Sequence, residues 1–112
     1  MSIIDLLLDT AQEDNKLLMK YDELGDNFSK SRDVDFTFNT SDLVQAEVVK
    51  DFVNDNNYGT ASLKEVDGRY RITVIINMPV TQNVISSISA LMACISKVFK
   101  VDYDGWGSVI SK

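Results

Sequence analysis

The chain has 112 residues, of which 45% are hydrophobic and 25% charged, with five glycines and one proline. This composition is typical of an ordinary globular domain and excludes disordered and collagen-like chains, so we expect one domain over residues 1–112. The formal net charge is −6. Because an acidic surface repels phosphates, direct binding of nucleic acid is disfavoured.

Cysteine and histidine usage narrows the function further. The sequence contains one cysteine, Cys94, and no histidine. A single cysteine forms no intramolecular disulfide, and the chain does not open on a basic stretch followed by a long apolar run, so we expect a cytoplasmic protein. The sequence also lacks the ~18 consecutive apolar residues of a membrane span, and we expect no membrane role. Without histidine, most transition-metal sites and all histidine-dependent catalysis are removed, so we expect no metal, no cofactor and no enzymatic activity.

The first element is predicted to be an amphipathic helix over about residues 2–24. Its apolar residues recur at helical spacing, and Gly25 supplies a stop signal. A polar connector follows, in which Phe28 is the residue expected to hold the connector to the body of the domain.

Residues 33–39 alternate between apolar and polar side chains, which predicts a strand covered on one side only. The apolar face consists of Val34, Phe36 and Phe38, and the polar face of Asp33, Asp35, Thr37 and Asn39.

The remaining elements have equally clear boundaries. Thr40, Ser41 and Asp42 offer N-cap oxygens for a helix of three to four turns that ends near Val53. Residues 58–65 and 69–78 flank an Asp-Gly pair, the signature of a β-hairpin. A helix capped by Thr81 then leads to a closing strand over residues 99–108.

After the first helix, the order of elements is β-α-β-β-α-β. This order predicts an α+β fold, a ferredoxin-like two-layer sandwich over about residues 32–110 with a four-stranded antiparallel sheet and an extra N-terminal helix. In that topology the first and third strands are central, and the fourth lies beside the first. We therefore expect an acidic, uncovered sheet face, made by Asp33, Asp35, Asp102, Asp104 and Trp106.

Two interpretations stay open for this face. Trp106 can hold the closing strand to the first helix or the connector, or it can anchor a partner, because tryptophan is enriched in binding hot spots. The aspartates can be a solvated surface, or they can attract a segment rich in arginine and lysine. RNA stacking, a calcium loop and carboxylate catalysis are each disfavoured, because outward aromatics, further oxygen ligands and an enclosing pocket are not predicted.

The closing segment also resembles a known family. Residues 99–107, and within them Tyr103, Asp104, Gly105, Trp106 and Gly107, resemble the closing signature of the regulator of ribonuclease E activity B family, the protein inhibitors of ribonuclease E. Residues 25–30 and 32–36 are similar to the linker and first strand of that family.

The resemblance implies a non-enzymatic, ferredoxin-like protein that binds the non-catalytic scaffold region of ribonuclease E and inhibits RNA decay. The long acidic C-terminal tail of the best-known members does not occur in this sequence, which ends at Lys112. The alternative function is a small-molecule-sensing or structural domain of the same fold, which would be indifferent to ribonuclease E and stabilised by its ligand.

Overall fold

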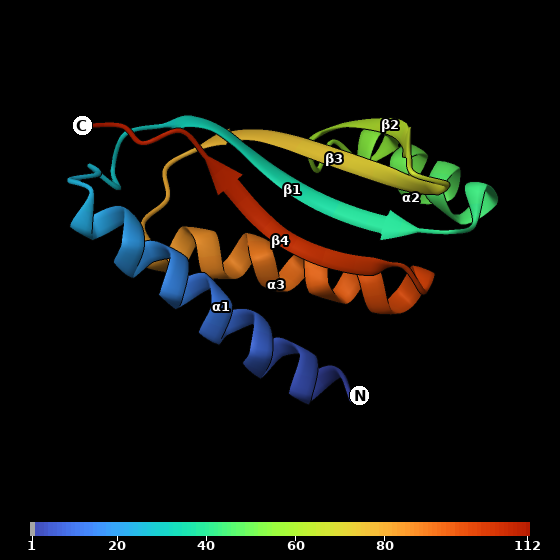
Figure 1. Cartoon of the computed structure of the whole chain (residues 1–112), viewed down its shortest axis with the longest axis horizontal. Helices are drawn as coiled ribbons and strands as arrows, with labels where there is room; N and C mark the ends of the chain where they lie inside the picture. Colours follow the sequence, from blue (N-terminus) through green and yellow to red (C-terminus); the bar gives the residue numbers. More distant parts are fainter. Residues whose placement is uncertain (1) are drawn as a thin grey trace.

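A computed structural model describes residues 2–112. The elements are α1 (Ile3–Glu23), β1 (Arg32–Thr40), α2 (Leu43–Asp55), β2 (Thr60–Val66), β3 (Arg69–Met78), α3 (Gln82–Phe99) and β4 (Asp102–Ser108). All neighbouring strands pair antiparallel, in the order β2-β3-β1-β4 (Figure 1). The predicted α+β sandwich is confirmed, with β1 and β3 central and β4 beside β1.

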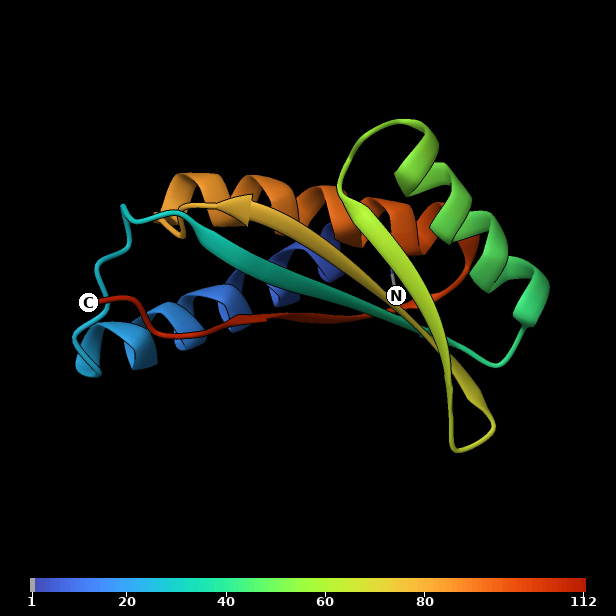
Figure 2. The ribbon, with the colours of Figure 1, turned by 90° about the horizontal axis from the view of Figure 1, so that it is seen from above.

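The helices form the second layer of the sandwich. Helices α2 and α3 cover one face of the sheet, and α1 packs against α3 and reaches β4 at the sheet edge (Figures 1 and 2). The core lies between the layers, where Val34, Phe36 and Phe38 have no exposed surface, whereas Asp33 and Asp35 are exposed. The strand predicted to be covered on one side only is confirmed, and the other sheet face is open.

Local signals explain most of the element boundaries. The Ser2 side chain accepts a hydrogen bond from the Asp5 N–H at the start of α1, and Asp42 caps α2 in the same way. At the end of α1, Gly25 adopts a φ of +82°, which favours glycine. Thr81 stands at the N-cap of α3, but its side chain makes no capping hydrogen bond, so that part of the prediction is wrong.

Backbone conformation fixes the hairpin turn and the start of the closing strand. Asp67 and Gly68 both have positive φ, as a two-residue hairpin turn requires. The closing strand begins at Asp102 and not at Phe99, because α3 continues to Phe99 and ends with Lys100 in the left-handed region.

Helix α3 is the most apolar element. By length and composition it could cross a membrane, a property that it shares with the core helices of soluble proteins. Its buried residues, among them Ile85, Met92 and Ile95, join the core that the sheet contributes to. Packing inside the sandwich therefore accounts for the apolar character of α3.

A buried ion pair fixes the connector between α1 and β1. Arg32 Nη1 lies 2.5 Å from Asp26 Oδ2, and the two side chains are 4% and 0% exposed. Arg32 also donates to the carbonyl oxygens of Asn27 and Lys30, and Asp26 Oδ2 accepts from the Ser111 N–H. The pair thus joins the connector, the start of β1 and the C-terminal segment. Phe28 packs against the core, as expected.

Candidate protein-binding surface

A β-bulge in β4 decides where the closing motif points. Phe36 of β1 pairs with Trp106, and Phe38 pairs with Tyr103, so β4 has one extra residue between these pairs. Gly105 is that extra residue, and its φ is +90°. Because a bulge reverses the alternation of the strand, Tyr103 and Trp106 both face the helices. The expectation that Trp106 stands on the open face with the aspartates is therefore wrong.

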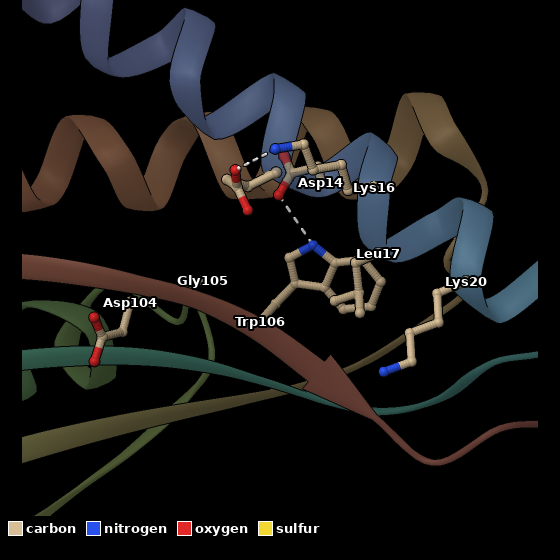
Figure 3. Close-up of a pocket in the computed structure, with 8 residues that line it drawn as sticks. Asp14, Lys16, Leu17, Lys20, Asp104, Gly105 and Trp106 are labelled. Carbon is tan, nitrogen blue, oxygen red and sulfur yellow. Dashed lines mark hydrogen bonds and ion pairs between the residues drawn. The ribbon is translucent and has the colours of Figure 1, made fainter.

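Trp106 instead connects β4 to α1. Only 8% of its surface is exposed. Its Nε1–H donates to Asp14 Oδ1 at 3.0 Å (Figure 3). Its ring meets the ring of Tyr21 edge-on at a centroid distance of 5.5 Å. The Tyr21 hydroxyl in turn bonds both the N–H and the carbonyl oxygen of Ser108. Of the two interpretations, the one in which Trp106 holds the closing strand to the first helix is confirmed.

Asp14 is the residue at the centre of this junction. Its Oδ1 also accepts from the Ser89 hydroxyl at 3.0 Å, and Ser89 lies 2.8 Å from the Tyr103 hydroxyl. Because Ser89 has one proton and gives it to Asp14, the Tyr103 O–H donates to Ser89. The junction therefore links α1, α3 and β4 through four side chains.

Burial changes the acidity of two groups in this junction. Asp14 is 3% exposed, and the loss of solvation raises its pKa above the ordinary value, against the opposing hydrogen bonds from Ser89 and Trp106. Burial likewise raises the pKa of the Tyr103 phenol, which stays neutral. Asp14 was not among the site residues predicted from the sequence. Asp14 lies at helical spacing from Leu18 and Tyr21, which places an acid on the apolar face of the helix. That placement was the available signal that Asp14 is buried.

The four aspartates of the predicted face are all exposed, as expected, but they form two pairs. Asp35 pairs with Gly107 across the strands, whereas Asp102 pairs with Asn39 at the other end of β1. Because β1 and β4 run antiparallel, Asp33 and Asp35 lie at one end of the strand pair, with Asp102 and Asp104 at the other end. The four do not converge on one point, so they form an elongated acidic strip along the outer side of β1 and β4.

The charged residues of the open face on β2 and β3 are basic. Lys64 and Arg71 pair across β2 and β3, and Arg69 forms an exposed ion pair with Asp102 at 3.1 Å. The acidic strip is therefore confined to the β1 and β4 side of the sheet. Within it, Asn77 donates to Asp33, and Asn39 donates to Asp104.

A groove runs between α1 and β4, beside the junction. It has two hollows of about 300 and 290 Å³, which share Glu13, Asp14, Asp104 and Gly105 as lining residues. Figure 3 shows Asp14 and Trp106 pointing toward each other across the groove, with the Asp104 side chain directed away from α1. We call this feature the α1–β4 groove.

Gly105→Ala is expected to lower the free energy of unfolding by about 1–2 kcal/mol, because an L side chain is strained at positive φ. Gly107→Ala is the matched control: Gly107 is two residues away, its φ is not in the strained region, and no atom lies within 4 Å of the added carbon. We expect a change within about 0.5 kcal/mol there. Denaturant unfolding measures both variants. Equal losses at the two positions would contradict the role given to the bulge.

Comparison with known proteins adds the family. The family model described as regulator of ribonuclease activity B matches residues 11–108, which include α1 from Ala11 onward, the whole sandwich and the closing motif. A search among curated proteins found no match. The match spans most of the chain, and the closing motif that it contains forms the strand edge and the Trp106 junction described above. The protein therefore belongs to the regulator of ribonuclease activity B family, whose name describes regulators and not ribonucleases.

Proposed function

We propose that the protein is a non-enzymatic, cytoplasmic regulator that binds the non-catalytic scaffold region of ribonuclease E and thereby inhibits RNA decay. The observation that carries this proposal is the acidic strip, exposed on an uncovered sheet face in a member of a ribonuclease-regulator family. A basic protein segment is the partner that such a strip attracts, whereas the RNA itself carries the same sign of charge.

The electrostatics of the strip predict how binding depends on conditions. Asp33, Asp35, Asp102 and Asp104 are exposed, so each interacts with a partner through solvent and contributes modestly to affinity. Exposed charges act mainly on the association rate, and salt screens them over about 8–10 Å. Binding should therefore be fast at low salt and weaken as salt is added.

The test is a titration of the purified chain with the scaffold region of ribonuclease E from the same host. Two double variants, Asp33→Asn with Asp35→Asn and Asp102→Asn with Asp104→Asn, remove two charges each while keeping side-chain shape. We expect each to weaken binding by roughly 3- to 10-fold at low salt, mainly through slower association.

The matched control removes the same charge elsewhere. Asp51→Asn with Asp55→Asn changes two exposed aspartates of α2, which covers the sheet face opposite the strip. We expect less than about a twofold effect on affinity. An unmodified chain that shows no saturable binding at roughly tens of micromolar and low salt would overturn the proposal. Stabilisation by a small molecule together with indifference to ribonuclease E would favour the ligand-sensing alternative.

A further inference from the structure

The α1–β4 groove holds a carboxylate whose hydrogen-bonding capacity is only half used. Both hydrogen bonds to Asp14, from Ser89 and from Trp106, go to Oδ1. Among residues 2–112, none donates to Asp14 Oδ2, although the residue is 97% buried and lines both hollows of the groove. Oδ2 is not one of the buried side-chain atoms that lack a partner, so it keeps contact with solvent in the groove, where a donor that carries positive charge can bind it.

The surroundings of Asp14 favour a cation. In the hollow that extends toward the start of α1, the charged lining residues are Asp9, Glu13, Asp14 and Asp104, and no lysine or arginine lines it. Glu13 pairs with Lys16, but both side chains are 72% exposed, so that ion pair is weak and easily exchanged. The adjoining hollow is lined by Lys16 and Lys20, so the side of Asp14 that lacks basic residues is the one toward the start of α1.

The apolar part of the lining determines which cation fits. Leu6 and Tyr103 line the same hollow as Asp14. A guanidinium group is planar, forms paired hydrogen bonds with a carboxylate and stacks on aromatic rings, while the methylene groups of its side chain pack against apolar surface. Arginine matches this combination better than lysine, whose ammonium group is compact and strongly hydrated.

The groove is also open to a longer chain. Gly105 forms part of its border, and no atom lies within 4 Å of the position where a side chain would begin. Beyond this low border, Asp104 points away from α1 and bonds Asn39 on the outer side of the sheet (Figure 3). A segment that enters the groove can therefore continue across Gly105 onto the acidic strip.

We propose that the α1–β4 groove binds an arginine side chain from an extended, basic segment of the partner protein, with the guanidinium group paired to Asp14. This inference rests on the proposed function and assigns it a specific pocket. The acidic strip supplies the long-range attraction, and the groove supplies the selective contact.

The test uses NMR titration of the full chain with the capped peptide Gly-Gly-Arg-Gly-Gly. Trp106 is the only tryptophan, so its indole N–H gives one resolvable signal beside Asp14. We expect saturable shifts of that signal and of the Gly105 amide. The same peptide with citrulline in place of arginine keeps the shape and removes the charge, and it should produce no saturable shift.

Variants of the chain test the assignment of the pocket. Asp14→Asn keeps an oxygen that accepts from Ser89 and Trp106 but removes the charge, and it should lower affinity for the arginine peptide by at least about tenfold. Asp51→Asn, on the exposed face of α2, should leave affinity unchanged. If Asp14→Asn does not fold, Asp9→Asn with Glu13→Gln, both exposed on α1, should still weaken binding by roughly threefold. Equal binding of the citrulline peptide, or unchanged affinity in folded Asp14→Asn, would overturn the inference.

Failure of the inference can be told from failure of the proposed function. Binding of the ribonuclease E scaffold without a shift of the Trp106 indole signal would overturn the groove inference and leave the proposed function standing. Arginine-dependent binding in the groove without any binding of the scaffold would support the groove and overturn ribonuclease E as the partner.

Discussion

Trp106→Ala is expected to lower the free energy of unfolding by about 3–5 kcal/mol, the usual cost of removing a large buried aromatic side chain. The loss has three parts: packing against the core, the edge-on contact with Tyr21, and the hydrogen bond to Asp14. Together these contacts attach α1 to β4. Urea unfolding followed by circular dichroism measures the change, since the variant has no tryptophan fluorescence.

Two milder variants separate these parts. Trp106→Phe keeps most of the packing and removes the hydrogen bond, so we expect a loss of about 1–3 kcal/mol. Asp14→Ala leaves the Trp106 Nε1–H and the Ser89 hydroxyl without their acceptor and should cost a similar amount. A Trp106→Ala variant as stable as the natural chain would contradict the junction that we describe.

The same variants bear on partner binding. Trp106 lines the groove but is only 8% exposed. We therefore expect Trp106 to affect partner binding indirectly, by holding Asp14 in position. Trp106→Phe should therefore weaken arginine binding less than Asp14→Asn does. A larger effect of Trp106→Phe would indicate that the ring itself contacts the partner.

Much of the fold could be predicted from the sequence, because its signals are local. The alternation of Val34, Phe36 and Phe38 identified the buried face of β1, and the Asp67-Gly68 pair identified the hairpin. Once the elements were known in order, the crossover rules left one reasonable arrangement of four strands. Thr81 shows the limit of such signals, since it occupies the cap position and its side chain makes no capping hydrogen bond.

The candidate site was harder to predict, because it depends on contacts between distant segments. Strict alternation along β4 places Trp106 on the open face, and only the extra residue at Gly105 turns it inward. Asp14 and Trp106 are 92 positions apart, and the place of Asp14 on the apolar face of its helix indicates burial without indicating its partner. Periodicity describes single elements and does not report which polar groups meet between them.

Arg32→Ala is expected to lower the free energy of unfolding by about 3–5 kcal/mol, because it leaves the buried Asp26 carboxylate without its cation. Asp26 Oδ1 already has no hydrogen-bond partner among the described residues, so the remaining compensation at Oδ2 would be the Ser111 N–H. The double variant Arg32→Met with Asp26→Leu removes both charges and should recover most of the loss. Thermal unfolding of the natural chain, of Arg32→Met, of Asp26→Leu and of the double variant, treated as a double-mutant cycle, measures the coupling.

The ion pair of Arg32 and Asp26 also predicts that the natural chain loses stability at acidic pH. Burial by itself raises the pKa of Asp26, but the hydrogen bonds from Arg32 and from the Ser111 N–H, together with the Arg32 charge, outweigh burial and lower it below the ordinary value of 3.8. A carboxyl group with a lowered pKa in the folded state contributes stability that is fully present above the pKa of the unfolded chain and is lost as pH falls through the folded value.

Asp14, whose pKa is raised mainly by burial, has the opposite sign, and its contribution falls as pH rises above 3.8. Asp26→Asn should therefore flatten the loss of stability below about pH 4, whereas Asp14→Asn should remove a decline just above it, and unfolding curves between about pH 2 and 7 distinguish the two. If both variants kept the pH dependence of the natural chain's free energy of unfolding, neither buried carboxylate would control it.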